Sequence, residues 1–419
     1  MAGRTQHLLA AFSTCLAITV PVRASDVLQF LTNIAPPYQE MVDGALDGSS
    51  MRTLSCVMTR LNQRYEVDLA PWLRAREQVR NGAAQGLFSV AADFDNQSGN
   101  GRLSLPLALE RWVWVTLTGV KPMRFALEKD QRVAAVLGSN QLKWLEGQGA
   151  NIGGGARSTV QLLRMLAARR VDAVLVDEAE LHIAWQEAGV DPTALAVSFE
   201  RYMPLGVYFS NAFLDANPGF LERFNREIAA CPSSSMSLSP MERRAVLAAA
   251  RHIQEMLLAE PRLLPALLLA DQASAGLSVP QILERDGLYQ RHRTTMNHPL
   301  VRAVRDHPLS ALLARLRAAS KGEVAEIQLF DNAGLTLAAD PLPSDLWQAD
   351  EAKFSQTVPK GSDSIFVDAI SFDESTSQYS VQASFALPGK EPGSVAGGLT
   401  IGLNIEHTLN TDGAKPWLP

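Results

Sequence analysis

Arg132-Val-Ala-Ala-Val-Leu137 and Val171-Asp-Ala-Val-Leu-Val176 are short apolar runs on either side of a segment with helical spacing. In that segment, residues 159–169, the leucines recur at the interval that places them on one face of a helix. A strand–helix–strand order is typical of a parallel pair, because the chain has to cross over the sheet between two parallel strands and a helix makes this crossing. The stretch therefore predicts an α/β fold.

The alternation of strands and helices extends over residues 26–231. Strands are expected over the apolar runs 27–34, 85–90 and 112–117, and a helix over 51–64 from the spacing of its apolar residues. Ligands in such folds bind at the carboxyl ends of strands, so residues that follow these strands are candidates for a ligand site.

The sequence changes character after residue 231. A linker rich in proline and serine reaches Pro240, and a helical pattern then continues to about residue 320, with Ser278 placed as an N-cap before Pro280. Four β-type runs separated by turn-forming residues follow, at 324–330, 364–370, 379–386 and 396–405. They predict a compact antiparallel sheet domain preceded by its own helices.

The N-terminus has the pattern of a cleaved export signal. Arg4 precedes an apolar run over 8–22, and Val-Arg-Ala at 22–24 supplies the small residues that signal peptidase needs. The run is shorter than the roughly 20 residues that span a bilayer, and no later segment is a credible span. We expect residues 1–24 to be removed, so that Ser25 begins a periplasmic protein. The alternative is a buried N-terminal helix.

The chain is acidic, with 38 Lys and Arg against 44 Asp and Glu residues and a formal charge of −6. This balance argues against a nucleic-acid partner. After residue 24 the sequence contains two cysteines, Cys56 and Cys231. In an oxidising compartment such a pair is a plausible disulfide, and the alternative is two separate buried thiols.

Six short motifs occur in order over residues 27–230. They are Ala35-Pro-Pro-Tyr38, Pro71-Trp-Leu-Arg74, Val79-Arg-Asn-Gly-Ala-Ala-Gln-Gly-Leu-Phe88, Leu103-Ser-Leu-Pro106, Val136-Leu-Gly-Ser-Asn140 and Arg170-Val-Asp-Ala-Val-Leu-Val-Asp177. In order and spacing they resemble the bacterial extracellular solute-binding proteins of family 3, the polar amino-acid type with the periplasmic binding protein type II fold. The resemblance implies two α/β lobes that close on a ligand by a hinge motion. Lobe 1 would comprise 27–115 and 205–231, with lobe 2 between them.

The resemblance also implies which residues meet the ligand. They are Tyr38, Trp72, Arg74 and Ser89 in lobe 1, and Ser139, Asn140 and Asp177 in lobe 2. Tyr38 would lie against the ligand, and Asp177 would hold an ammonium group. The alternatives are structural, with Tyr38 as a packing aromatic and the three lobe 2 residues as helix caps.

One position departs from the family pattern. Amino-acid binders carry an arginine shortly before the equivalent of Leu103–Pro106, where it clamps the α-carboxylate of the ligand. Gln97 takes that place here, and neither Arg74 nor Arg102 is in register with it. This departure puts an α-amino acid ligand in doubt.

The C-terminal third resembles a second family. Glu326-Ile-Gln-Leu-Phe-Asp-Asn-Ala-Gly-Leu335, followed by residues 344–354, is similar to the PAS-like extracytoplasmic (Cache-type) domains of bacterial receptors. Such domains bind small molecules over the sheet, which would make Trp347, Asp350 and Asp368 a second ligand site. The alternative is that Trp347 closes the core and the two acids cap turns.

The two resemblances divide the chain into a signal peptide (1–24), a two-lobe solute-binding domain (25–231), a linker with helices (232–320) and a Cache/PAS-like sensor domain (321–410). No enzyme, cofactor or metal is expected, because the seven histidines lack metal-ligand spacing and no nucleophile elbow or phosphate loop occurs. The leading expectation is periplasmic binding of a small polar or anionic solute, amino acid-like or an organic acid, and its delivery to an ABC permease. The alternative is a soluble sensory accessory that binds a small ligand and modulates a membrane receptor.

Overall fold

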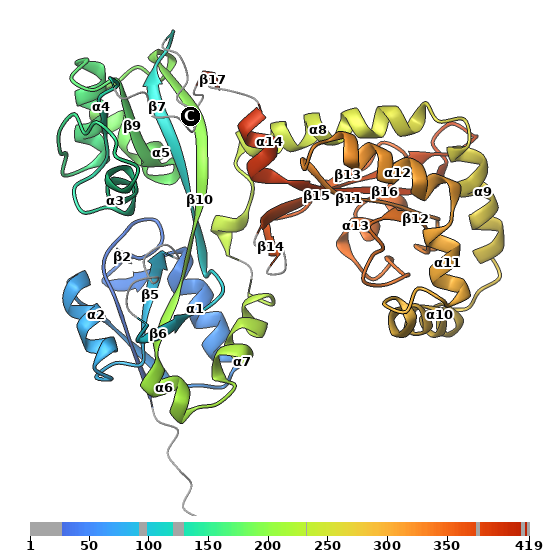
Figure 1. Cartoon of the computed structure of the whole chain (residues 1–419), viewed down its shortest axis with the longest axis horizontal. Helices are drawn as coiled ribbons and strands as arrows, with labels where there is room; N and C mark the ends of the chain where they lie inside the picture. Colours follow the sequence, from blue (N-terminus) through green and yellow to red (C-terminus); the bar gives the residue numbers. More distant parts are fainter. Residues whose placement is uncertain are drawn as a thin grey trace, which may run out of the picture.

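The computed structural model describes residues 27–91, 99–119, 130–231, 233–373, 378–411 and 415–416. The predicted signal peptide and Gln97 lie outside these residues. Figure 1 shows two lobes stacked along a pair of long strands, with a third unit beside them. This third unit, residues 240–411, is called the C-terminal unit below.

Lobe 1 is a parallel sheet covered by helices. Its strands are β1 (Leu28–Thr32), β4 (Tyr65–Leu69) and β5 (Gly86–Ala91), with a small hairpin of β2 (Glu40–Val42) and β3 (Ala45–Asp47). Its helices are α1 (Ser49–Arg60), α2 (Trp72–Arg80), α6 (Asn211–Ala216) and α7 (Phe220–Ile228). β1 pairs in parallel with both β4 and β5. The apolar faces of α1 and α7 pack in one buried cluster with Phe30, Phe88 and Phe209 of the sheet.

Lobe 2 contains the strand–helix–strand unit that the sequence predicts. Its strands are β8 (Val133–Ala134) and β9 (Ala173–Asp177), and its helices are α3 (Asn140–Gly147), α4 (Thr159–Ala167) and α5 (Glu178–Ala188). β8 and β9 are parallel, and three leucines of α4 are buried against them. β8 is shorter than the predicted strand, because beyond Ala134 the chain forms only an isolated bridge from Val136 to Ala156.

Two long antiparallel strands join the lobes and are called the hinge strands, or the hinge, below. They are β7 (Ala108–Leu117) and β10 (Leu195–Ser210), which run through both lobes and link them in one sheet of order β4-β1-β5-β10-β7-β9-β8. In each lobe a hinge strand lies antiparallel beside the parallel strands. β6 (Gly101–Leu103) adds to β10 at the lobe 1 end. This is the two-lobe α/β fold expected from the sequence.

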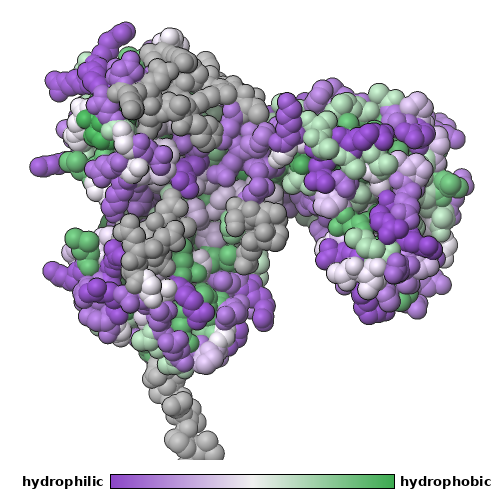
Figure 2. Space-filling view, viewed as in Figure 1, coloured by the Kyte–Doolittle hydropathy of each residue, from purple (hydrophilic) through white to green (hydrophobic). Residues whose placement is uncertain are grey.

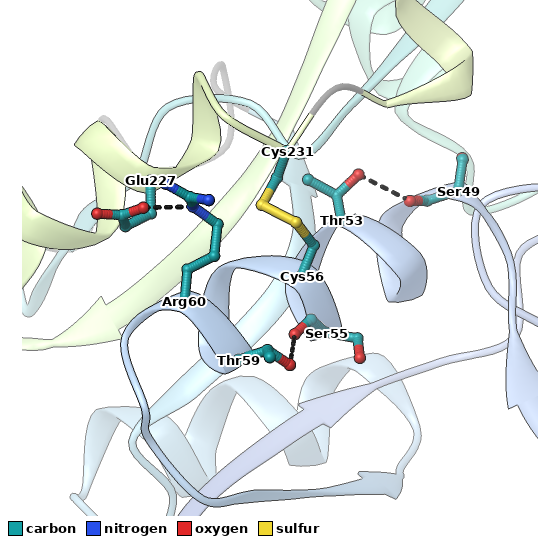
Figure 3. Close-up of a disulfide and its surroundings, with 8 residues drawn as sticks. All are labelled: Ser49, Thr53, Ser55, Cys56, Thr59, Arg60, Glu227 and Cys231. Carbon is teal, nitrogen blue, oxygen red and sulfur yellow. Dashed lines mark hydrogen bonds and ion pairs between the residues drawn. A yellow bond between two sulfur atoms is a disulfide. The ribbon is translucent and has the colours of Figure 1, made fainter.

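A disulfide connects Cys56 of α1 with Cys231 at the end of lobe 1, as predicted, with a Cα–Cα distance of 5.8 Å (Figure 3). One helical turn further along, Arg60 pairs with Glu227 of α7 at 2.5 Å. The bridge closes a loop of 175 residues, which includes all of lobe 2. It therefore fixes the chain where it leaves lobe 1 for the C-terminal unit.

The C-terminal unit places five helices before an antiparallel sheet, the order that the sequence predicts. The helices are α8 (Pro240–Leu258), α9 (Leu263–Ser274), α10 (Val279–His292), α11 (Pro299–Arg305) and α12 (Pro308–Ala319). The sheet strands are β11 (Val324–Phe330), β12 (Thr336–Asp340), β13 (Ile365–Val367), β14 (Ser371–Asp373), β15 (Gln378–Pro388) and β16 (Val395–Asn404). Their order is β12-β11-β16-β15-β13, with β14 on β15. Two short helices, α13 (Ala352–Ser355) and α14 (Ile405–Thr411), complete the unit, and β17 (Lys415–Pro416) pairs with β10.

Two details of the helices follow from proline and serine. Ser278 is the N-cap of α10 and forms a capping box with Gln281, as its place before Pro280 predicts. Pro308 begins α12 and separates it from α11, because proline cannot continue the hydrogen-bond pattern of a preceding helix.

Within the described residues, no single helix has both the length and the apolar composition to cross a bilayer, although α9 and α10, bent by 115° at their junction, meet both criteria as a pair.

Candidate ligand-binding cleft

Two sequence-predicted site residues meet where the lobes touch. Tyr38 follows β1 in lobe 1, and Asp177 ends β9 in lobe 2. The Tyr38 hydroxyl donates a hydrogen bond to Asp177 Oδ2 at 2.9 Å and also lies 3.3 Å from the carbonyl oxygen of Leu109. Tyr38 is 4 % exposed and Asp177 is 2 % exposed. The two lobes are therefore joined by a polar contact between residues 139 positions apart in the chain.

Asp177 occupies the N-cap position of α5, yet its side chain makes no capping hydrogen bond. Its second oxygen, Oδ1, accepts a hydrogen bond from the backbone amide of Arg111 on β7 at 2.9 Å. The carboxylate thus contacts both lobe 1 and the hinge.

Glu110 and Glu180 complete a group of three acids with Asp177, called the acid cluster below. Glu110 Oε2 accepts from Trp112 Nε1 at 2.7 Å, and Glu180 Oε2 accepts from Thr159 Oγ1 at 2.6 Å. Burial, followed by the negative charge of Asp177, raises the pKa of Glu110 to about 8. Burial and the charge of Glu180 raise the pKa of Asp177 to about 7. Burial also raises the pKa of Glu180.

The acid cluster defines what can bind here. Loss of hydration and mutual repulsion both disfavour the charged carboxylates, so the cluster holds protons near neutral pH. A positively charged group would relieve both costs, whereas an anionic group would add to them. Sequence reasoning missed Glu110 and Glu180. For Glu110 a signal was present, since a charged Glu-Arg pair interrupts the apolar run of residues 105–117.

Ser89 lies in a small polar group in lobe 1. It is the bulged residue of β5, where the pairing with β10 shifts register, and its φ of 62° lies in the left-handed region. Its hydroxyl donates to Gln39 Oε1 at 3.1 Å, and Gln39 Nε2 donates to Thr32 Oγ1 at 3.3 Å. A non-glycine residue in this backbone conformation is held there by its surroundings.

The predicted pair on α2 lies elsewhere in lobe 1. Trp72 is half-buried against the apolar cluster that contains Leu31 and Leu87, and Arg74 is exposed. A second arginine of α2, Arg76, interacts with lobe 2: burial, followed by the positive charge of Arg76, lowers the pKa of Lys143 on α3. These two positive charges come from opposite lobes.

Ser139 is the N-cap of α3, and its hydroxyl accepts a hydrogen bond from the amide of Leu142 at 3.1 Å. Asn140 is the first residue of the helix. Both are half-buried. The structural role considered from the sequence is thus realised for Ser139.

The structure does not bring the three predicted residues of the C-terminal unit together. Trp347 packs against a cluster with Tyr289 and donates from Nε1 to the carbonyl oxygen of Ala333 at 2.9 Å. Asp350 is exposed. Asp368 is also exposed and lines a cavity whose lining contains neither of the other two.

The opposite face of β7 carries a different arrangement, called the hinge contact below. Arg111 Nε donates to Glu242 Oε1 of α8 at 2.7 Å, and the Tyr202 hydroxyl of β10 donates to the same oxygen at 2.6 Å. Glu242 is 0 % exposed. Arg111 also lies 3.9 Å from Glu178, whose pKa burial and the charge of Glu242 raise to about 7. The C-terminal unit is therefore bound directly to both hinge strands.

No protein-family model and no curated protein sequence matches the chain. Solved structures that resemble part of it include a histidine kinase sensor domain similar to periplasmic binding proteins, with a TM-score of 0.40 and 16 % identity over 49 % of this chain and 89 % of that one. The GluR0 ligand-binding core from Nostoc punctiforme in complex with L-glutamate has a TM-score of 0.38 and 15 % identity over 48 % of this chain and 92 % of that one. The L-cystine solute receptor of Neisseria gonorrhoeae has a TM-score of 0.37 and 16 % identity over 49 % and 87 %. At these values the likenesses carry no argument about function, which depends instead on the side chains of this chain.

Proposed function

We propose that this protein binds a small solute with a positively charged group in the cleft between its lobes. The observation that carries this proposal is the acid cluster at the lobe junction, where Asp177 meets Tyr38 of the other lobe at 2.9 Å. A bound ammonium or guanidinium would take the place of protons on the acid cluster and of the Tyr38 hydroxyl on Asp177. Contacts from both lobes would then stabilise the closed form.

The charges across the cleft support an amino acid-like solute. Arg76 and Lys143, on opposite lobes, supply positive charge that suits a carboxylate. The acid cluster suits the cationic end of the same molecule. This arrangement would replace the arginine clamp that the family pattern places where Gln97 stands. It disfavours the purely anionic solute that the sequence left open.

Isothermal titration with matched solutes tests the proposal. L-arginine, L-lysine and putrescine should bind, whereas L-glutamate and succinate should not. Asp177→Asn should weaken the binding of the cationic solutes by more than tenfold, because one hydrogen bond to a charged group is worth about 1.5–3 kcal/mol. Asp172→Asn is the matched control, since Asp172 is a lobe 2 acid paired with Arg132. Equal binding of L-arginine to both variants would reject the cleft as the site.

The hinge contact favours a sensory accessory role for the bound state. Glu242 of the C-terminal unit contacts Arg111 and Tyr202, one on each hinge strand, so lobe movement would act on α8. Export through a signal peptide and docking of the Cache/PAS-like unit on a membrane receptor complete this proposal. Delivery to an ABC importer is the second candidate, and its support is that the lobes form a cleft without the C-terminal unit.

Cells that carry Glu242→Gln separate the two roles. In the sensory role, uptake of radiolabelled solute is unchanged and a solute-dependent transcriptional or motility response is lost. In the importer role, deletion of the gene abolishes uptake, and Glu242→Gln leaves every response to the solute intact.

A further inference from the structure

A cavity of about 430 Å³ separates lobe 1 from the C-terminal unit. Lobe 1 contributes Leu107, which leads into β7, and Cys231 of the disulfide; the C-terminal unit contributes Asp368, Ile370 and Phe372. Figure 2 shows an open gap between lobe 1 and the C-terminal unit below the region where they join. Ligand pockets in proteins span about 300–1,000 Å³, so the volume suits a small organic molecule.

The walls are largely apolar and built from the cores of both bodies. Leu107 is 0 % exposed, Cys231 is 2 % exposed and Ile370 is 4 % exposed. The backbone amide of Ile370 donates to the carbonyl oxygen of Met236, another lining residue, at 2.8 Å. An apolar body bound here would be held by surfaces that are already fixed, which lowers the entropic cost of binding.

The charged residue of the cavity lining indicates which polar group an occupant would carry. Among the described residues of the lining, the charge comes from Asp368. The Asp368 side chain caps the amide of Ala369 at 2.7 Å, and its backbone amide donates to the carbonyl oxygen of Gln382 at 3.0 Å. Gln382, which also lines the cavity, donates in turn from Nε2 to Glu326 Oε1 at 2.6 Å, so a second carboxylate lies one hydrogen bond away from the lining.

We infer that this cavity is a binding site for a small amphipathic amine, with its apolar body between Leu107 and Phe372 and its ammonium group at Asp368. This site is separate from the cleft and does not depend on the function proposed for it. The site is linked to the hinge by a row of aromatic rings. The ring centroids of Phe372 and Tyr379 lie 5.0 Å apart, and those of Tyr379 and Tyr202 of β10 lie 5.3 Å apart.

Titration with a matched pair of probes tests the site. 4-Phenylbutylamine and 4-phenylbutyrate share an apolar body and carry opposite charges. The amine should bind the purified protein at least tenfold more tightly than the carboxylate. Asp368→Asn should weaken amine binding by about tenfold, whereas Asp363→Asn, which removes an exposed acid from the same unit, should not change it. Ala369→Trp should abolish binding by filling the cavity from its exposed edge.

Asp177→Asn separates this site from the cleft and should leave amine binding unchanged. Thermal melts of each variant show whether it is folded, and the exposed positions of Asp368 and Ala369 make this the expected result. Any of three outcomes overturns the inference: no binding of the amine at 5 mM, equal binding of amine and carboxylate, or binding that Ala369→Trp leaves intact and Asp177→Asn removes.

Discussion

Glu110 and Arg111 are neighbours on β7, and the alternation of side chains along a strand places them on opposite faces of the hinge. Glu110 belongs to the acid cluster with Asp177 and Glu180. Arg111 belongs to the hinge contact, where it meets Glu242 at 2.7 Å. On one face a buried aspartate meets two half-buried glutamates, and on the other a buried glutamate meets a guanidinium and a tyrosine hydroxyl.

The difference separates a binding site from a structural contact. A buried charge is stabilised by its partner of opposite charge. Removing one member of the pair leaves the other buried without that partner, which destabilises the folded protein. Buried acids that repel each other instead hold protons and can exchange them for a cation. We therefore expect substitutions on the two faces of β7 to have opposite consequences for stability.

The largest expected effect is on the hinge contact. Glu242→Gln leaves Arg111 buried, with Glu178 as its nearest remaining carboxylate at 3.9 Å. The loss of a buried partner should lower the free energy of unfolding by about 3 kcal/mol, as measured by denaturant titration. Arg132→Gln is the control, because its pair with Asp172 is exposed and should contribute at most about 1 kcal/mol. Equal effects of the two substitutions would remove the distinction between the two faces.

The acid cluster should destabilise the folded protein once its carboxylates have lost their protons. The pKa of Asp177 is raised to about 7 and that of Glu110 to about 8, so the folded protein binds protons that the unfolded chain has already released above about pH 5. The free energy of unfolding should therefore fall as pH rises from 5.5 to 8.5, by on the order of 2 kcal/mol for one such group.

Glu110→Gln should reduce this slope and raise stability at pH 8.5, because it removes a buried acid that is then charged. Part of the slope should remain, since the pKa of Glu178 is also raised to about 7. Denaturant titrations at pH 5.5 and 8.5 measure both. A slope that Glu110→Gln leaves unchanged would show that the acid cluster is not its source.

Cation affinity gives the third test. At pH 6 a cation has to displace protons from the acid cluster, whereas at pH 8 much of the cluster has already released them. The affinity for L-arginine, whose guanidinium stays charged, should therefore rise by about tenfold over this range for one displaced proton. Titration in buffers of different ionisation enthalpy should show proton uptake by the buffer at pH 6. A pH-independent affinity would mean that the cation binds outside the acid cluster.

Much of the fold could be predicted because it depends on local patterns. The leucine spacing of residues 159–169 predicted α4, which ends two residues earlier, and the alternating runs predicted β11, β15 and β16 to within a few residues. β10 was not predicted, because Glu200, Arg201 and Pro204 interrupt its apolar pattern. Glu200 is accommodated by a hydrogen bond from Trp114 Nε1 at 2.7 Å, and its neighbours Phe199 and Tyr202 pack into the core of the C-terminal unit; sequence spacing shows neither contact.

The site could be predicted only in part for a related reason. Tyr38 and Asp177 follow strands, so the fold places them at the lobe junction. The acid cluster needs three elements to converge, namely β7, the end of β9 and the first turn of α5. The Glu-Arg pair at 110–111 interrupts an apolar strand, but the sequence does not show that Asp177 and Glu180 lie beside Glu110. The hinge contact was missed because Arg111 and Glu242 lie 131 positions apart.

Tyr38→Phe should give the smallest and sharpest effect. The substitution removes the hydroxyl that donates to Asp177 in the ligand-free protein, which should lower the free energy of unfolding by about 1 kcal/mol. A bound cation takes over that oxygen of Asp177, so the complex has already given up the hydrogen bond. The affinity for L-arginine should therefore rise, by about fivefold for 1 kcal/mol. Tyr289→Phe is the control, because its hydroxyl donates to the carbonyl oxygen of Pro343 in the C-terminal unit and should affect stability alone. A fall in affinity would instead mean that the Tyr38 hydroxyl contacts the solute, and that the cation does not compete with it for Asp177.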